Sequence, residues 1–255
     1  MKQQTIYYKD ELNDDFSEPV KVTKTIDENY KYVKKGILYK LKKFFWFRLI
    51  ATPFAFLYCK IKFKRKIVNK KLLKKQKGYF LYGNHTQQGF DAFNPPMLTF
   101  PKESYEIVNP ANLCVKAIGR FVPILGGLPL PDNLKAYRNF LDAIKFYSEN
   151  KAVVIYPEAH IWPYYTKIRP FLSKSFKYPV ELNKPTFCFT NVYVKRKFSK
   201  NPKIITYIDG PFYGNGKTLK EKQEDLRNQV YFAMVKRSEL NNYEYIKYVK
   251  EKTND

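Results

Sequence analysis

Two short runs of hydrophobic residues near the middle of the chain predict buried strands. The first covers residues 78–83 (GYFLYG), and the second covers residues 152–156 (AVVIY) and stops at Pro157. Short apolar runs bounded by turn residues are typical of strands that are covered on both faces. Further hydrophobic stretches predict strands at residues 186–194 and 203–209.

Helices are predicted between and after these strands. Apolar residues recur at spacings of three and four along one segment: Leu134, Tyr137, Leu141, Ile144 and Tyr147. Asp132 or Asn133 is a suitable N-cap for this helix, and Asn150 is a suitable end. A second, polar helix is predicted over residues 218–236. Because strands alternate with helices, we expect an α/β fold with a mixed, mostly parallel sheet flanked by helices.

A third apolar stretch begins at about Gly36 and differs in character. Its aromatic and aliphatic centre, residues 44–59, has basic residues on both sides and contains Arg48 and Pro53. The centre is shorter than the ~20 residues of a membrane-spanning helix. Lys-flanked helices rich in Phe and Trp are typical of the headgroup region of a bilayer. We expect an N-terminal amphipathic membrane-docking helix or helix pair, with a buried core helix or a single tilted span as alternatives.

These patterns divide the chain into three parts. Residues 1–35 form a polar N-terminal arm in which we expect partial order, and residues 36–77 form the basic, amphipathic membrane-interface segment. Residues 78–255 form the α/β domain. The arm does not resemble a secretory signal, because it is polar and carries charges of both signs.

The charge of the chain indicates anionic partners. Lys and Arg total 47 and Asp and Glu total 23, which gives a net charge of +24. Such a field attracts an anionic lipid surface, nucleic acid or an acidic protein. Lys outnumbers Arg, which favours surface attraction over base-specific contacts. The three cysteines are far apart and fit neither a disulfide framework nor a zinc site, so we expect a reducing compartment and no metal.

The two histidines of the chain each follow one of the predicted buried strands. His85 follows the first strand in the sequence Asn84-His85-Thr86-Gln87-Gln88-Gly89-Phe90-Asp91. Sites in open α/β sheets form at the carboxyl ends of strands. A His is a suitable general base at neutral pH, and a carboxylate on its other nitrogen fixes the tautomer. His85 and Asp91 are therefore the candidate catalytic pair, although a helix-capping His beside an unrelated Asp would give the same pattern.

The second strand is followed by Tyr156-Pro157-Glu158-Ala159-His160. Glu158 could bind an acceptor hydroxyl, or it could be a carboxylate placed at a helix N-terminus. His160 could hydrogen-bond a headgroup.

With these residues in place, the chain resembles the PlsC-like glycerolipid acyltransferases, of which lysophosphatidate acyltransferase is the best-known member. The resemblance covers residues 78–210 and depends on three segments and a later strand. These are Asn84-His85 with Asp91, which is similar to an NHxxxxD motif, Tyr156-Pro157-Glu158, which is similar to an FPEGTRS-like motif, and the Gly- and Pro-rich residues 116–129 between them. A proline-containing strand at residues 184–187 is similar to the family's late motif.

The resemblance implies an O-acyltransferase that moves a fatty acyl group from acyl-CoA or acyl carrier protein to a lysophospholipid or related acceptor. It implies His85 as general base, Asp91 as its orienting acid and no resident cofactor. Asn84, Glu158 and His160 are then expected to contact substrate, with Lys116 and Arg120 near an acceptor phosphate and the Gly126 and Gly127 backbone N–H groups at the oxyanion. The expected location is the cytoplasmic face of the cell membrane.

Three departures from the family pattern affect these expectations, one of which is that residues 130–133 lack the acidic-then-basic pair that often follows the family's middle motif. Five residues separate His85 from Asp91, where the family has four, and one extra helical residue turns a side chain by ~100°. Gly89 could absorb the extra residue as a bulge or by delaying a helix start. The second motif has Ala159 in place of Gly and lacks its Arg, so the phosphate contact would pass to other basic residues: Lys116, Arg120, Lys135, Arg138, Lys167 or Arg169.

Three other functions remain open at this point. The first is a catalytically inactive, lipid-binding homologue, which the extra residue before Asp91 would explain. The second is a nucleic-acid-binding protein that uses its basic and aromatic side chains, although the chain has none of the common binding motifs. The third is an esterase, although the chain lacks the GxSxG segment expected of one.

Overall fold

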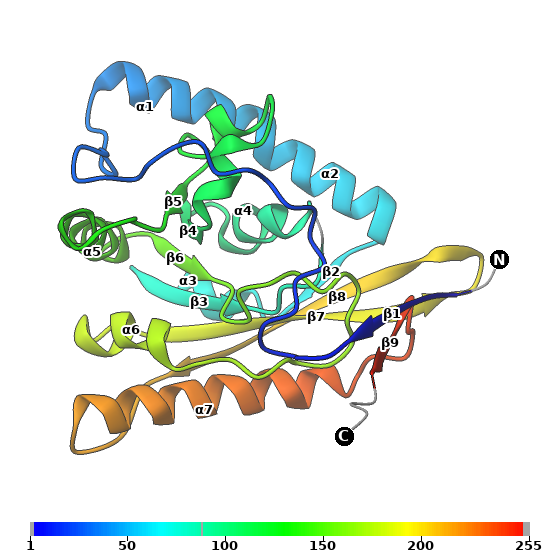
Figure 1. Cartoon of the computed structure of the whole chain (residues 1–255). Coiled ribbons are helices and arrows are strands. Elements are labelled where there is room, and N and C mark those ends of the chain that lie inside the picture. Colours follow the sequence, from blue (N-terminus) through cyan, green and yellow to red (C-terminus); the bar gives the residue numbers. More distant parts are fainter. Residues whose placement is uncertain (1–2, 88, 252–255) are drawn as a thin grey trace.

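The centre of the molecule is a seven-stranded sheet (Figure 1). The computed structural model describes residues 3–87 and 89–251. The strands are β2 (Lys66–Val68), β3 (Tyr79–Gly83), β4 (Ser104–Val108), β5 (Gly127–Pro129), β6 (Ala152–Ile155), β7 (Thr186–Arg196) and β8 (Ser199–Phe212). Their order is β2-β8-β7-β3-β6-β4-β5, and every pairing is parallel except that of β7 with β8. This confirms the predicted mixed, mostly parallel α/β fold.

Helices cover both faces of this sheet. One face carries α5 (Leu134–Ser148), α6 (Lys177–Glu181) and α7 (Leu219–Ser238). The other face carries α1 (Ile37–Lys43), the π-helical η1 (Phe44–Ala51), α2 (Thr52–Phe63), α3 (Lys71–Lys74) and α4 (Asn94–Thr99). Short 3-10 helices are η2 (Asp91–Phe93), η3 (Pro110–Cys114), η4 (Gly119–Phe121) and η5 (Lys174–Phe176).

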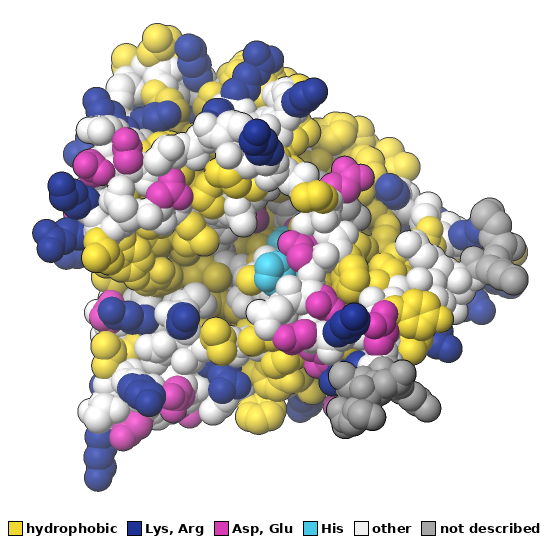
Figure 2. All heavy atoms as spheres, viewed as in Figure 1, with side chains coloured by type: hydrophobic (Ala, Val, Ile, Leu, Met, Phe, Trp, Pro, Cys, Tyr) yellow, Lys and Arg dark blue, Asp and Glu magenta, His cyan; other side chains and the backbone are white. Residues whose placement is uncertain are grey.

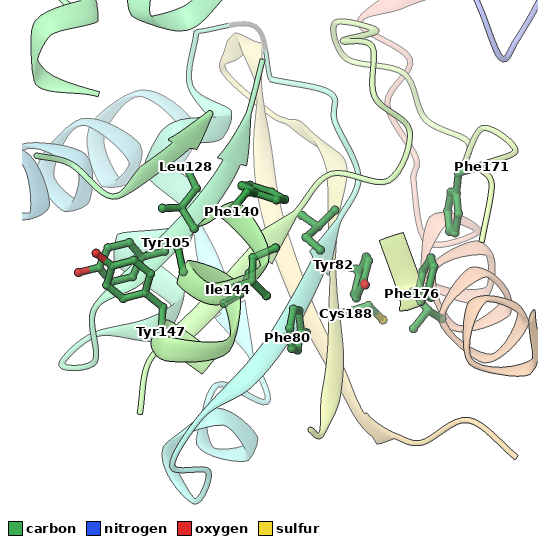
Figure 3. Packing of buried hydrophobic residues seen from close by; sticks show 14 of the residues in the cluster. Phe80, Tyr82, Tyr105, Leu128, Phe140, Ile144, Tyr147, Phe171, Phe176 and Cys188 are labelled. Atoms are coloured by element: carbon green, nitrogen blue, oxygen red, sulfur yellow. The ribbon is translucent and has the colours of Figure 1, made fainter. Parts of the chain in front are cut away.

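The two predicted buried strands, β3 and β6, pair with each other in the middle of the sheet. Alternate residues of a strand point to opposite faces, so each strand contributes to two hydrophobic layers. Phe80 and Tyr82 face α5, α6 and α7, where Tyr82 stacks on Phe176 with ring centroids 4.1 Å apart (Figure 3). Tyr79 and Leu81 face α3 and α4 on the other side. Covering on both faces explains why these strands are apolar at every position.

The N-terminal apolar stretch forms one continuous helix, Ile37–Phe63, of 27 residues. The helix extends beyond the apolar centre identified in the sequence, and by length and composition it is long and apolar enough to cross a membrane. One side of the helix packs against the domain through Phe47, Ala55, Cys59 and Phe63. The opposite side leaves large apolar side chains exposed, and Figure 2 shows hydrophobic side chains together with Lys and Arg over this part of the molecule. The helix thus lies along the domain with one side buried and the opposite side exposed.

The segment that follows this helix also belongs to the sheet. Residues 66–68, which the sequence assigned to the membrane-interface segment, form β2 and pair with β8. The hydrophobic pattern of three residues is too short to mark a strand in a basic run, so sequence analysis missed it.

The N-terminal arm crosses the surface of the domain and is ordered in contact with it (Figure 1). Its first strand, β1 (Gln4–Tyr8), pairs in parallel with β9 (Ile246–Lys250) near the other end of the chain. Farther along, Ile26 is 1% exposed and its backbone N–H donates to Asp132 Oδ2 over 2.5 Å. Because Asp132 binds the arm, Asn133 is the N-cap of α5 and accepts a hydrogen bond from Ala136 N. The partial order expected of the arm was an underestimate.

We predict that the arm contributes to the stability of the whole domain. Ile26→Ala should lower the free energy of unfolding by about 2–4 kcal/mol, because it removes a fully buried side chain. Val22→Ala, at a position that is 51% exposed in the same arm, should change it by less than about 0.5 kcal/mol. Chemical denaturation of both variants measures the difference. Equal, small effects would show that the arm folds independently of the core.

Candidate active site

The candidate site lies where β3 ends, at the carboxyl edge of the sheet. Asn84 directly follows the strand and is 1% exposed. Its side-chain amide donates to the backbone oxygen of Asn191 on β7 (3.2 Å), and its Oδ1 accepts from Asn191 N (2.8 Å). Both ends of the Asn84 amide are therefore used to join the two strands. Asn84 holds the start of the loop in place and does not face a substrate, contrary to its expected role.

The imidazole of His85 is bound to the carboxylate of Asp91. His85 Nδ1 lies 2.8 Å from Asp91 Oδ2, and the side chains are 15% and 4% exposed. Asp91 Oδ2 also accepts from Gln87 N (2.9 Å), and Asp91 Oδ1 accepts from Asn94 Nδ2 (2.9 Å). Since a carboxylate only accepts, Nδ1 carries the proton and Nε2 keeps a lone pair. The more exposed partner of this pair is thus prepared to take up a proton.

Gly89 and a delayed helix start accommodate the extra residue between His85 and Asp91. Gly89 has φ +70°, in the left-handed region that glycine adopts without strain. Phe90 N and Asp91 N both donate to Gln87 O, at 2.8 and 2.9 Å, which closes a tight turn. Asp91 is the first residue of η2 and precedes α4, so its side chain is placed by a turn and not by helical rotation.

Tyr156 forms the wall behind the imidazole. Its ring stacks on that of His85 with centroids 4.4 Å apart and an interplanar angle of 21°. Its hydroxyl donates to the backbone oxygen of Asp91 over 2.7 Å and lies 3.3 Å from Asn94 Nδ2. The tyrosine therefore fixes both members of the pair, one through its face and one through its hydroxyl.

Glu158 lies beneath the loop and is not open to a substrate. Its carboxylate accepts from His85 N (2.8 Å) and Arg169 N (2.9 Å), and the residue is 3% exposed. Arg169 Nη2 lies 3.8 Å from Glu158 Oε2 and also donates to Glu158 O over 3.2 Å. The expected contact with an acceptor hydroxyl is thus corrected to a positioning role, in which Glu158 ties the loop after β6 to the backbone of His85.

Arg65 is a further part of the site that the sequence did not reveal. Its guanidinium donates to Asn94 Oδ1 and to Gln87 Oε1. Asn191 Nδ2 lies 3.3 Å from the same Gln87 oxygen. The residues that bind Asp91 are therefore bound in turn by Arg65, which places a cation behind the carboxylate. Arg65 lies within a basic run of the sequence, so no local pattern distinguishes it from its neighbours.

The glycines expected at an oxyanion are placed elsewhere. Gly126 N donates to Pro123 O (3.3 Å) and Gly127 N donates to Val122 O (2.8 Å), so both N–H groups are used within their own turn. They lie at or before β5, which is the edge strand, while β6 and β4 separate it from β3. A Cβ at Gly126 would lie 2.4 Å from Ser104 O, so the glycine serves close packing of the turn. This placement contradicts the oxyanion role.

The candidate headgroup contacts are also dispersed. Lys116 and Arg120 are exposed, and Arg120 lines a cavity of about 450 Å³ whose other lining residues include Lys24 and Cys114 but neither His85 nor Asp91. His160 binds the arm instead, with Nδ1 3.0 Å from Asp15 Oδ2. The structure therefore brings together His85 and Asp91 but does not bring Lys116 or Arg120 into contact with them. Figure 2 shows the histidines beside a hollow walled largely by hydrophobic side chains.

One acidic residue, Glu106 on β4, faces the site without having been predicted. It is neither fully buried nor exposed. The pKa of its carboxyl is raised to about 7, mainly by burial and in part by the charge of Asp91, while His85 opposes the shift. Its neighbour Tyr105 points to the other face of the sheet, where it stacks on Tyr147.

We predict that Glu106 makes the stability of the protein depend on pH near neutrality. Because its folded pKa of about 7 lies above the ordinary value, the fold favours the protonated form. Stability from this group is complete at low pH and is lost as the pH rises through 7. Glu106→Gln should therefore raise the free energy of unfolding by about 1–3 kcal/mol more at pH 8 than at pH 5. Denaturant titrations at both pH values measure this, and exposed Glu224→Gln is the control; parallel behaviour of the two variants would contradict the prediction.

Among the comparisons with known proteins, the structural comparison supports the fold and the sequence comparisons find no match. No family model matches the chain, and no curated protein matches it. Among solved structures, the chain is similar to the 1-acyl-sn-glycerophosphate (LPA) acyltransferase PlsC from Thermotoga maritima, with a TM-score of 0.50 and 13% sequence identity. The match covers 81% of this chain and 97% of the T. maritima chain. At this identity the similarity establishes a shared fold.

Proposed function

We propose that this protein is an O-acyltransferase that moves a fatty acyl group from a thioester to a hydroxyl of a lipid acceptor at a membrane surface. The observation that supports this most directly is the 2.8 Å contact between His85 Nδ1 and Asp91 Oδ2, which persists despite the extra residue between them. The similarity of the fold to a lysophosphatidate acyltransferase is consistent with the same chemistry.

The reaction begins with deprotonation of the acceptor. His85 Nε2 takes the proton of the acceptor hydroxyl while Asp91 stabilises the resulting imidazolium through Nδ1. The acceptor oxygen then attacks the thioester carbonyl and forms a tetrahedral intermediate. Its collapse breaks the carbon–sulfur bond and releases the thiolate, which can take up the proton held by His85. One ester forms and one thioester is lost, so neither a metal nor a redox cofactor is required.

The donor in this proposal is acyl-CoA or acyl carrier protein. Either would be attracted by the net charge of +24, because the phosphates of CoA and the surface of an acidic carrier protein are negative. The acceptor is a lysophospholipid or related glycerolipid. Its acyl chain requires an apolar surface next to His85, and the hollow beside the histidines in Figure 2 offers one.

The helix Ile37–Phe63 is the proposed membrane-docking element. Its outward side exposes a set of large apolar residues: Ile37, Leu38, Leu41, Phe44, Phe45, Leu49, Ile50, Phe54, Leu57 and Ile61. Lysines at both ends would bind anionic headgroups, at about 1 kcal/mol for each Lys or Arg close to the surface. A location at the cytoplasmic face of the membrane remains a prediction.

The catalytic pair can be tested by two substitutions. His85→Ala should lower kcat for acyl transfer by at least about 10²–10⁴-fold, because it removes the general base. Asp91→Asn should lower kcat by a similar factor, because an amide can stabilise the wrong imidazole tautomer and not the imidazolium. The measurement is product mass after incubation of lysolipids with labelled acyl-CoA and with acyl carrier protein.

A matched control separates loss of chemistry from loss of structure. Asp142→Asn changes an exposed aspartate on α5 and should leave kcat unchanged. Thermal unfolding should show that all variants are folded. Full turnover in folded His85→Ala would exclude the proposed mechanism, while absence of turnover in the unmodified protein with retained lipid binding would identify an inactive homologue.

We also predict that membrane binding depends on the outward side of the helix. The double variant Leu49→Asp/Phe54→Asp should lower partition onto vesicles of anionic phospholipid by about tenfold or more, because side chains that are 53% and 55% exposed would no longer enter the bilayer. Phe232→Asp, at a 65% exposed position on α7 across the sheet, is the control. Vesicle co-sedimentation measures both. Equal effects of the two variants would place the docking surface elsewhere.

A further inference from the structure

The position of Glu106 is fixed by the register of the sheet. Glu106 on β4 pairs with Val154 on β6, two residues before Tyr156. Because Tyr105 packs against α5, Glu106 points to the opposite face, which it shares with Val154 and Tyr156. A strand spacing of ~4.8 Å and a rise of ~3.3 Å per residue place the Cα atoms of Glu106 and Tyr156 about 8 Å apart. The ring of Tyr156 stacks on the His85 imidazole, and both His85 and Asp91 act on the charge of Glu106, so Glu106 lies near the His85–Asp91 pair.

No structural role accounts for this carboxyl group. Glu103 pairs with Lys43 and Lys151, and Glu158 binds two backbone N–H groups. Among the described residues, by contrast, neither a hydrogen bond nor an ion pair holds the Glu106 side chain. Partial burial of a carboxyl without a partner is unfavourable, and burial is the main cause of the raised pKa of Glu106. A group that destabilises the fold and faces a reaction site is a candidate for substrate contact.

The charges around the site argue against an acceptor with a phosphate close to its reacting hydroxyl. Asp91 and Glu106 are both acidic, and their mutual repulsion contributes to the raised pKa of Glu106. The guanidinium of Arg65 is used by Asn94 and Gln87 behind Asp91. Arg169 is 1% exposed and is bound to Glu158. A phosphate placed beside Glu106 would thus meet an acid and no available cation from these two arginines.

We propose that Glu106 is an acceptor-recognition residue, and that it hydrogen-bonds a hydroxyl or ammonium group of an acceptor that has no phosphate next to its reacting hydroxyl. This inference rests on the proposed acyl transfer and replaces the lysophospholipid acceptor named there by a lipid without a phosphate beside its hydroxyl. A neutral polyol lipid such as a monoacylglycerol, or a long-chain amino alcohol, has the required donor group. A lysophosphatidate has no such group besides its reacting hydroxyl and carries a phosphate beside it.

The test replaces the acid with a neutral and with a cationic side chain. Glu106→Gln and Glu106→Lys are compared with the unmodified protein on monoacylglycerol, a long-chain amino alcohol and lysophosphatidate. We expect kcat/KM of the unmodified protein to favour one of the first two acceptors over lysophosphatidate by at least tenfold. Glu106→Lys should reverse the preference, mainly through KM, and Glu106→Gln should weaken it for the amino alcohol more than for the monoacylglycerol. Glu224→Lys, on the exposed side of α7, should change neither.

Binding measurements separate this inference from the proposed function. The same residue-106 substitutions are made in the His85→Ala background, and equilibrium binding of the three lipids is measured without turnover. A lipid preference that follows residue 106, combined with no acyl transfer by the unmodified protein that retains His85, would support the Glu106 contact and exclude the enzyme. Turnover that requires His85 but keeps the same acceptor preference in every residue-106 variant would overturn the Glu106 contact alone. If Glu106→Lys does not fold, the isosteric Glu106→Gln decides by the same criteria.

Discussion

The site depends on one buried carboxylate that has to be fully hydrogen-bonded. Asp91 is 3% exposed, and an isolated charge at such a position would be strongly unfavourable. Three donors satisfy it: the His85 ring, Gln87 N and Asn94 Nδ2. Each donor comes from a different structural context, namely the end of β3, the turn that follows it and the start of α4. The carboxylate therefore orders the loop, and the orientation of the imidazole follows from that order.

The surrounding sheet makes this arrangement rigid. The His85 backbone is tied to the loop after β6 through Glu158, and Asn84 is tied to β7 through Asn191, so the two strands that flank β3 both hold the catalytic loop. Glu158 and Asn84 thus fix the loop that carries the His85–Asp91 pair. Such supporting contacts are the means by which a catalytic group is kept within a few tenths of an ångström of its working position.

Sequence patterns predicted the central strands and the pairing of His85 with Asp91 for a physical reason. Strands such as β3 that are covered on both faces must be continuously apolar, and a His after such a strand must lie at the carboxyl edge of the sheet. Gly89 was identified as the residue able to absorb the extra position, because only glycine adopts its backbone conformation without strain. Likewise, the alternatives Asp132 and Asn133 for the helix cap could not be separated until the arm was seen to occupy Asp132.

The remaining parts of the site depend on contacts between distant segments, which no local pattern records. Arg65 lies in a basic run, where the sequence does not distinguish it from the neighbouring lysines. In the structure it binds the residues around Asp91. Glu158 looks available in sequence because it follows a strand and a proline, but Arg169 and the His85 backbone occupy it. In the sequence, Gly126 and Gly127 suggest backbone N–H groups that are available to a ligand. In the structure both N–H groups donate hydrogen bonds within their own turn. In each case the residue type was informative, but only the structure showed which group it contacts.

The distribution of charge between the surface and the site gives the last constraint. The net charge of +24 acts at long range and draws the protein toward anionic surfaces. At short range the environment of His85 is different, because Asp91 and Glu106 are acidic and the nearby Arg65 is used by side-chain amides. In the proposed function, attraction to a phosphate-rich membrane and selection of the acceptor would therefore depend on different residues. In this proposal the membrane lipids carry the negative charge that attracts the protein. The acceptor that binds near His85 then carries no phosphate beside its hydroxyl.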